Sequence, residues 1–213
     1  MVPTFEKFVL RSTLTSPFGR KVRIAAMVLG LSERITLVPA DTRDENDTLR
    51  EQNPLGKMPC LLIDDGTVLY DSRVIIEFLQ EVAGSERLLP ARGLRRYEAL
   101  ARASLADGVT DAALLMVYEG RFRGTGTPAQ LWLDHQRGKV VRGLAAFEGA
   151  PPDPTVTDVV SIGLACALGY LDWRKPVTWR ADHPGLVAWL AAFEAREPAA
   201  TATRLIMADA AAG

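Results

Sequence analysis

The spacing of the apolar residues changes once along the chain, and this change constrains the fold more than any other feature. Up to about residue 83, short apolar runs typical of strands alternate with stretches of helical spacing, whereas after about residue 92 the spacing is helical throughout. Strands that alternate with helices build a sheet covered by helices, and helices alone pack on one another. The sequence therefore predicts an α/β domain followed by an all-α domain.

Two β-rich runs frame the first predicted helix. Residues 7–12 and 35–40 are rich in β-branched or other apolar side chains, and a Gly-terminated amphipathic run opens between them at Ser16-Pro17. A strand, a helix and a second strand in this order normally make a parallel pair. We therefore expect a βαβ unit at the start of the chain.

A hairpin and a helix complete the first half. Residues 58–71 contain two apolar runs separated by Asp65-Gly66, residue types that tolerate the positive φ of a tight turn. Residues 72–84 follow with apolar side chains at helical spacing and a glycine at the end. The order βαβ and then ββα predicts a mixed sheet of about four strands with helices packed against it.

The segment 85–93 separates the two halves. It contains Pro90 and Gly93 and is the best candidate for a linker. We therefore expect domains at 1–84 and 94–213, and the chain shows no internal repeat.

The second half is predicted to consist of helices. Amphipathic spacing covers the stretches 94–122, 128–149 and 183–196. The run 159–171 is nearly uncharged and must be buried, so its first amide groups need a local partner. Thr155 with an acid three residues later, Asp158, predicts a capping box with Thr155 as the N-cap. The tail from residue 197 onward has no clear period.

Composition and charge exclude several classes of protein. The chain has 213 residues, of which 48% are apolar and 24% charged, and its net charge is −1. This balance is typical of a globular protein and lacks the basic surface that nucleic acid or an acidic membrane would need. No apolar run approaches the roughly 18 residues of a membrane span, and the N-terminus lacks the layout of a signal peptide. We expect a cytoplasmic protein.

Cysteine and histidine usage indicates no metal site. Cys60 and Cys166 stand far apart without a C-x-x-C spacing, so neither a disulfide framework nor a dithiol motif is indicated. His135 and His183 are isolated as well. We expect Cys60, inside an apolar run, to be a small buried side chain.

Ser16 has two interpretations that the local pattern leaves open. A serine before Pro17 suits the N-cap and first position of a helix, and this structural role is the favoured one on local grounds. Free amide groups and the positive end of the helix dipole also make a helix start an anion site. Asp71-Ser72, before the helix at 72–84, presents the same choice.

The segment Lys57-Met58-Pro59 adds a third candidate element. A cis bond between Met58 and Pro59 would mark a tight turn with a rigid, exposed backbone. A trans proline would simply open a strand at the edge of the sheet.

Three motifs, in this order and at these separations, carry a family resemblance. They are S-P-F-G-x-K-V-R from Ser16, N-P-L-G-K-M-P from Asn53 and D-S-R-x-I from Asp71. Together they resemble the glutathione-binding half of a glutathione S-transferase, and are most similar to the bacterial serine-type branch and to the tau and zeta classes. The resemblance extends to about Leu79 and implies a thioredoxin-like N-terminal domain followed by an all-helical C-terminal domain.

The resemblance implies that Ser16 is the catalytic residue. Its hydroxyl would donate a hydrogen bond to the sulfur of bound glutathione, instead of closing the helix, and would not itself be the nucleophile. A free thiol has a pKa of about 8.5, which falls near helix N-termini, so the hydroxyl and the helix together would favour the thiolate. In a distorted turn, Thr13 or Thr15 would face the sulfur instead. Phe18 would lie beside the thiol or pack in the core.

The other two motifs match the remaining glutathione contacts of the family. Met58 matches the residue whose backbone pairs with the cysteinyl unit, and Pro59 matches the cis-proline that presents it. Asp71 and Ser72 match the pair that holds the γ-glutamyl end, the acid for the amino group and the hydroxyl for the carboxylate. Lys57 is positioned to attract the glycyl carboxylate, unless it is a solvated surface lysine.

The resemblance also implies a second substrate, a small and apolar electrophile lying between the domains. Tyr118, Arg121 and Phe122, near the end of the helix that follows the linker, are the candidates for its wall. The reaction would be attack by the glutathione thiolate on an electrophilic centre, with glutathione as co-substrate and no metal. A homodimer and a role in detoxification follow from the resemblance alone.

Two other function classes stay open at this stage. A non-catalytic glutathione-binding or regulatory protein would have the same fold, although the presence of all three motifs argues against it. A thiol-disulfide exchanger similar to glutaredoxin or the omega class needs a cysteine where Ser16 stands, and Cys60 is badly placed to replace it.

Overall fold

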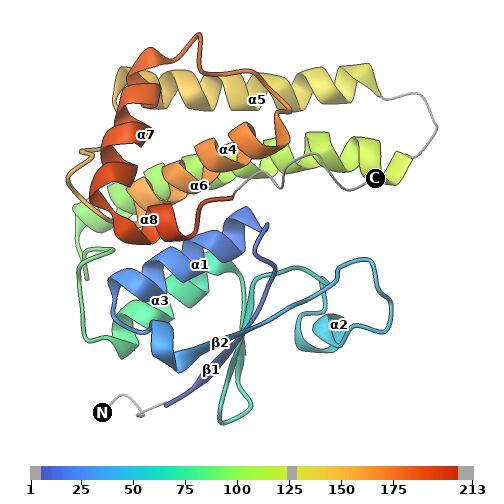
Figure 1. Ribbon diagram of the computed structural model, residues 1–213, viewed down its shortest axis with the longest axis vertical. Coiled ribbons are helices and arrows are strands. Elements are labelled where there is room, and N and C mark those ends of the chain that lie inside the picture. Colours follow the sequence, from blue (N-terminus) through green and yellow to red (C-terminus); the bar gives the residue numbers. More distant parts are fainter. Residues whose placement is uncertain (1–5, 124–128, 206–213) are drawn as a thin grey trace. The chain divides into compact units, whose positions relative to one another are not determined.

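The structure is a computed structural model that describes residues 6–123 and 129–205 (Figure 1). The chain divides into two units, Met1–Arg96 and Tyr97–Gly213. Among the described residues, all strands lie in the first unit, and those of the second unit form helices and connecting loops. The predicted fold class, a thioredoxin-like sheet domain followed by a helical region, is confirmed.

The first unit is built on a four-stranded sheet with the order β2-β1-β3-β4. The strands are β1 (Phe8–Arg11), β2 (Ile35–Val38), β3 (Cys60–Ile63) and β4 (Val68–Leu69). β1 pairs parallel with β2 and antiparallel with β3, which in turn pairs antiparallel with β4. Gly66, with φ of 88°, lies in the turn between β3 and β4, where the sequence predicts it.

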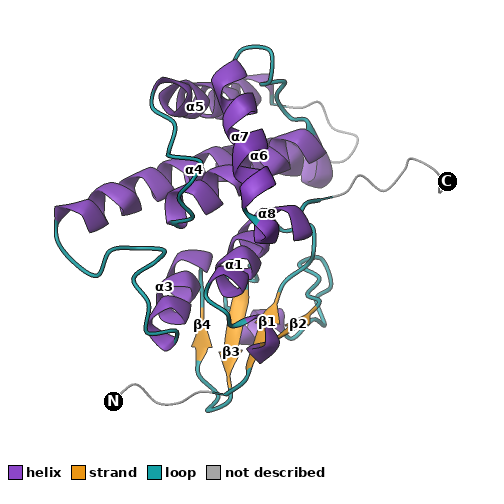
Figure 2. Ribbon diagram, turned by 60° about the vertical axis from the view of Figure 1, so that its left-hand side comes forward, coloured by secondary structure: helices purple, strands orange, loops and turns teal. Residues whose placement is uncertain are grey.

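Helices of the first unit pack on the sheet through alternating side chains. They are α1 (Pro17–Val28), the single turn η1 (Ser32–Arg34), α2 (Leu49–Gln52) and α3 (Ser72–Val82). α1 and α3 pack against each other, and α3 also contacts β3 (Figure 2). Phe8 lies opposite Ile63 in the β1–β3 pair. Its ring packs edge-on against that of Phe78 in α3, with the ring centroids 5.9 Å apart. The opposite face of β3 places Cys60 against Leu49 of α2.

The segment 85–93 is attached to α3. Gln80 accepts hydrogen bonds from the amides of Leu88 and Leu89 at 2.9 and 2.8 Å, and its own amide donates to the Leu89 carbonyl at 2.8 Å. Both leucines are fully buried. This connection is therefore an ordered part of the first unit.

The second unit contains the helices expected from apolar spacing. The expected helices are α4 (Leu94–Arg123), α5 (Gln130–Gly149), α6 (Val159–Arg174) and α7 (Pro184–Arg196), and α8 (Pro198–Ala202) follows them. α6 is buried on almost all sides, as its uncharged sequence predicts. α8 was not predicted, because five residues are too few to show a helical period. No helix among residues 6–123 and 129–205 is both long and apolar enough to cross a membrane.

The predicted capping box at Thr155 is wrong by three residues. Asp158 is the N-cap of α6, and its carboxylate accepts from the amides of Val160 and Ser161, both at 2.9 Å. The Ser161 hydroxyl accepts from the Asp158 amide at 2.9 Å and completes the box. Thr155 instead donates to Asp153 at 2.7 Å. Serine at the N3 position replaces the usual Glu or Gln, so the motif was not visible in the sequence.

Replacing Asp158 by Ala is expected to lower the free energy of unfolding by about 1–2 kcal/mol, because two amides of the buried α6 lose their acceptor. Thr155→Ala is the matched control and is expected to change stability by less than about 0.5 kcal/mol. Urea denaturation followed by circular dichroism measures both. An equal loss in the two variants would contradict the assignment of the cap.

Candidate functional site

Strand pairing brings the three sequence motifs to one end of the sheet. β1 ends and β3 begins at this end, because Arg11 lies opposite Cys60 in their antiparallel pair. β4 ends there too, because Leu69 lies opposite Leu61. The segments that follow β1, precede β3 and follow β4 therefore meet at one edge, and they carry Ser16, Met58-Pro59 and Asp71-Ser72.

Ser16 caps helix α1. Its buried hydroxyl oxygen accepts a hydrogen bond from the Gly19 amide at 3.1 Å. The expectation that this hydroxyl does not close the helix is therefore wrong. A hydroxyl has two lone pairs and one proton, so an oxygen that accepts from an amide still has its proton to donate. Thr13 and Thr15 are the alternatives to Ser16 for the contact with the sulfur. Their hydroxyl oxygens lie 3.1 Å apart and are hydrogen-bonded to each other.

Gly19 belongs to the site although its role was not predicted. A Cβ at this position would lie 1.9 Å from the hydroxyl oxygen of Ser12 and 3.3 Å from the Cβ of Ser16. Ser12 directly follows β1 and is fully buried. The glycine thus allows the first turn of α1 to approach the end of β1. A glycine inside an amphipathic helix, where it costs about 1 kcal/mol relative to alanine, was the signal in the sequence.

The bond between Met58 and Pro59 is cis, which confirms one of the two predicted conformations. Pro59 is buried and the Lys57 side chain is exposed. Asn53 holds this loop, because its side-chain amide donates to the Lys57 carbonyl at 2.8 Å and its oxygen accepts from the Leu55 amide at 3.1 Å. The backbone on either side of Met58 is therefore fixed by the preceding turn.

Asp71 and Ser72 form the start of α3. The Asp71 carboxylate accepts from the Arg73 amide at 3.0 Å, so Asp71 is the N-cap of the helix. The Asp71 side chain is exposed. The bond from Tyr70 to Asp71 is also cis. Ser72 is buried, and its hydroxyl accepts from the amino group of Lys21 at 3.5 Å. The structure thus adds a buried positive charge from α1 to this motif.

Lys21 and Phe18 lie on the same helix as Ser16. The Lys21 amino group is 5.9 Å from the centroid of the Phe18 ring, which is partly buried. In the sequence, Lys21 was one letter of a motif and gave no independent signal, because a lysine in an amphipathic helix usually faces solvent.

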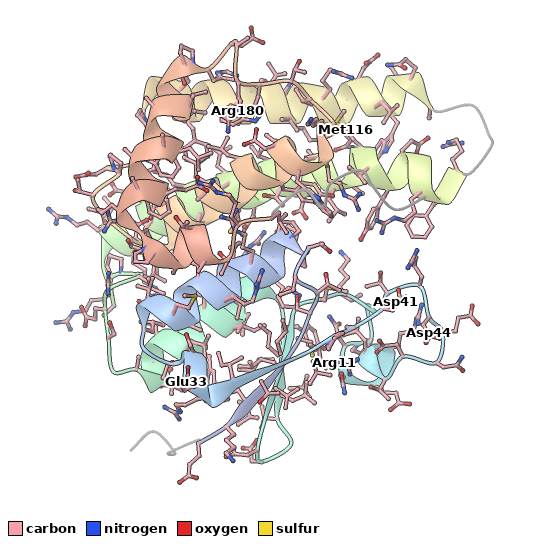
Figure 3. All side chains as sticks on the ribbon, in the orientation of Figure 1. Arg11, Glu33, Asp41, Asp44, Met116 and Arg180 are labelled. Atoms are coloured by element: carbon pink, nitrogen blue, oxygen red, sulfur yellow. The ribbon has the colours of Figure 1, made fainter. Side chains whose placement is uncertain are left out.

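Arg11 is a second residue that sequence analysis did not identify. This buried side chain donates to Asp47 at 2.6 Å, to Thr48 at 2.8 Å, to Gln52 at 2.7 Å and to the Pro39 carbonyl at 3.3 Å. Figure 3 shows Arg11 reaching from the sheet toward the segment that contains α2. That segment directly precedes Asn53 and the cis-proline loop, so Arg11 fixes the base of the loop.

The Asp47 carboxylate is the centre of this network. It accepts from the amides of Asp41 and Leu49, both at 2.7 Å. These two amides, followed by the guanidinium of Arg11, hold the pKa of Asp47 below its ordinary value of 3.8. The carboxylate is therefore ionised in the folded protein under all but acidic conditions.

Tyr118, Arg121 and Phe122 contact one another near the end of α4, in the second unit. The Arg121 guanidinium lies 4.8 Å from the Tyr118 ring centroid, and the rings of Tyr118 and Phe122 meet edge-on at 5.4 Å. The three residues predicted to line the electrophile site thus form one cluster.

Within the described parts of the chain, no group of three or more His, Cys, Asp and Glu side chains is placed to hold a metal ion.

Comparisons with known proteins support one family. The family model described as "Glutathione S-transferase, N-terminal domain" matches residues 15–82. The chain is 34% identical to an uncharacterized GST-like protein of Escherichia coli K12, over 84% of this chain and 89% of that protein. A glutathione transferase family member from Pseudomonas fluorescens Pf-5 with bound glutathione is 37% identical, has a TM-score of 0.86, and is matched over 94% of this chain and 100% of its own.

A second structure, described as a glutathione transferase family member from the same Pseudomonas strain, contains bound S-(propanoic acid)-glutathione. It is 38% identical to this chain, with a TM-score of 0.83 over 94% of this chain and 100% of its own.

Cys60 is expected to be chemically inert in the folded protein. Burial raises the pKa of its thiol to about 11, and Arg11 opposes this shift only in part. Cys60 and Cys166 are both buried, and neither forms a disulfide. Dithionitrobenzoate at about pH 8 should therefore release no colour from the native protein within minutes and should titrate both thiols after unfolding. Rapid reaction of the native protein would contradict this and would favour thiol-disulfide chemistry.

Asp47 is expected to make the fold sensitive to acid. Because its pKa is lowered on folding, it stabilises the folded state above its ordinary pKa of 3.8, and this contribution is lost as the pH falls through the lowered value. Asp47→Asn should be less stable than the parent near neutral pH and should lose less stability below about pH 4. Asp182→Asn, which removes an exposed carboxylate, is the control and should follow the parent in urea denaturation across the pH range.

Proposed function

Because the chain belongs to the glutathione S-transferase family, we propose that it is a glutathione transferase that holds the thiol of glutathione as a thiolate and directs it at a small electrophile. One observation carries the proposal above all others. The Ser16 hydroxyl, at the start of α1, shares one end of the sheet with Met58-Pro59 and Asp71-Ser72.

Ser16 would stabilise the thiolate by donating its proton in a hydrogen bond. The Gly19 amide occupies a lone pair of the hydroxyl oxygen, and this bond orients the hydroxyl without using its proton. The positive end of the α1 dipole adds to the effect. A shift of one pKa unit corresponds to about 1.4 kcal/mol, so these two contributions suffice for a thiolate at neutral pH.

The remaining groups would bind the two ends of glutathione. Asp71 would accept from the γ-glutamyl amino group, and Ser72 would donate to the γ-glutamyl carboxylate, with the charge of Lys21 beside it. The Met58 backbone would pair with the cysteinyl unit. Lys57, whose side chain is exposed, would attract the glycyl carboxylate. Phe18 would contribute an apolar surface beside the thiol.

The chemical step would be nucleophilic substitution or addition by the bound thiolate. In a substitution, a carbon–sulfur bond forms at the electrophilic carbon and the leaving group departs with the bonding electron pair; in an addition, the same bond forms and the π electron pair of the electrophile takes up a proton from solvent. In both, the thiol proton goes to solvent. Binding both reactants in one site supplies the proximity. The Pseudomonas relative with S-(propanoic acid)-glutathione supports a site that holds conjugates as well as glutathione.

Other parts of the proposal rest on the family resemblance alone. Residues 1–84 would bind glutathione, and residues 94–213, with Tyr118, Arg121 and Phe122, would contact the electrophile. A homodimer, a cytoplasmic location and a role in detoxification complete it.

Ser16→Ala is expected to raise the pKa of the bound thiol toward the free value of about 8.5 and to lower kcat/KM by about a hundredfold. Thiolate absorbance as a function of pH and conjugation of chlorodinitrobenzene measure the two effects. Ser16→Gly separates this role from capping, because glycine at an N-cap costs only a few tenths of a kcal/mol while it also lacks the hydroxyl.

Thr13→Ala and Thr15→Ala are the matched controls, and both should retain the thiolate pKa and the activity. An unchanged pKa in Ser16→Ala would contradict the role of this residue. Retention of the protein on immobilised glutathione without conjugation of any electrophile would instead favour the non-catalytic glutathione-binding protein.

A further inference from the structure

Helices α4 and α6 meet at one close contact in the second unit. The helices approach each other where Gly163 faces Ala106, since a Cβ on the glycine would lie 3.2 Å from that of the alanine. They run in the same direction (Figure 1). At a rise of about 1.5 Å per residue, Tyr118 is roughly 18 Å beyond this contact on α4 and Arg174 roughly 16 Å beyond it on α6. Tyr118–Phe122 and Tyr170–Arg174 therefore lie on the same side of this contact, toward the C-terminal ends of their helices.

Aromatic rings hold two arginines on this side of the contact. The guanidinium of Arg121 lies 4.8 Å from the Tyr118 ring centroid, and that of Arg174 lies 4.0 Å from the Trp173 ring centroid. The ring centroids of Trp173 and Tyr170 lie 6.1 Å apart. Stacking of this kind fixes the plane of a guanidinium and leaves its N–H groups for another partner.

These two arginines differ from their neighbours in having no acidic partner within residues 6–123 and 129–205. Arg123, close to Arg121, pairs with Glu119, and Arg180, which follows α6 and is labelled in Figure 3, pairs with Asp172 at 2.6 Å. Arg121 and Arg174 are exposed. Arg121 and Arg174 thus present two positive charges that no acidic side chain of the described residues neutralises.

The Tyr170 hydroxyl lies within the field of the same groups. Arg174, Tyr118 and Arg121 all lie near enough to influence the ionisation of this hydroxyl. Burial nevertheless dominates and raises the pKa of this hydroxyl, so Tyr170 is neutral and able to donate a hydrogen bond at physiological pH. Two guanidinium groups, two phenols and the faces of Trp173 and Phe122 are therefore gathered in one cluster.

We propose that this cluster, consisting of Tyr118, Arg121, Phe122, Tyr170, Trp173 and Arg174, binds the carboxylate and the ring of an aromatic acid, so that the preferred electrophiles are aromatic carboxylates. Guanidinium groups bind carboxylates through paired N–H donors, and the rings stack on an aromatic ligand. The inference rests on the proposed function and replaces the expectation of an apolar electrophile. Tyr170, Trp173 and Arg174 were not among the residues predicted from the sequence.

Chlorodinitrobenzoate and its methyl ester form a matched pair of substrates for the test. In both, the glutathione sulfur bonds to the ring carbon that carries chlorine, chloride leaves with the bonding electron pair, and the thiol proton goes to solvent. Only the acid carries a negative charge. The parent protein should have the higher kcat/KM for the acid.

Arg121→Gln and Arg174→Gln should each lower kcat/KM for the acid by about tenfold, because a hydrogen bond to a charged group is lost. Conjugation of the ester should fall clearly less than conjugation of the acid, because the ester has no negative charge for the guanidinium to bind. Arg137→Gln removes an exposed arginine from α5 and is the control, which should leave kcat/KM for both substrates unchanged. Equal losses for acid and ester, or unchanged values for the acid, would overturn the proposal.

A second measurement tests the site without turnover. Dinitrobenzoate lacks the chlorine, and its binding can be followed by titration calorimetry with the parent and the same variants. Weaker binding by about tenfold in Arg121→Gln and Arg174→Gln, but not in Arg137→Gln, would support the site. Equal binding by all four proteins would overturn it. If no electrophile is conjugated by the parent, the proposed transferase function fails, and this titration still decides the anion site.

Discussion

The antiparallel register of β1 and β3 is the constraint on which the rest of the first unit depends. With Arg11 opposite Cys60, Leu10 and Leu61 lie on the face where Phe8 meets Phe78 of α3, while Arg11 and Cys60 lie on the face of α2. A shift of one residue would exchange the two faces of β3, because side chains alternate along a strand. It would also move Pro59 away from the end of β1. One pairing therefore determines the sheet core, the position of the Arg11 network and the edge at which the three motifs meet.

Apolar periodicity predicted the strands and the long helices because each of them shows its own repeat, whereas the short helices α2 and α8 are too short to show one. The uncharged run of α6 and the Asp65-Gly66 turn are local signals, and both were confirmed. Arg11 and Lys21 could not be predicted, because their roles depend on partners that are distant in sequence, Asp47 and Ser72. Hydrogen bonds to such partners leave no pattern in a single sequence, since a buried cation and a solvated one are the same letter.

At the start of α1, one serine can both cap the helix and take part in the proposed chemistry. A cap needs an oxygen that accepts, and a thiolate needs a proton that is donated; Ser16 has both. The close approach at Gly19 puts the hydroxyl of Ser16 near the buried Ser12, at the junction of strand and helix. The structural role thus orients the group on which the proposed chemistry depends, and the two roles support each other.

The Arg11 network makes the order of one surface segment depend on a side chain of the sheet. Residues 39–52 contain four of the acceptors around this guanidinium, and few of the residues in the segment are buried. Such a segment has little apolar contact of its own to resist local opening. Its amides would therefore exchange with solvent as a single cooperative unit, at a rate set by how often Arg11 releases its partners.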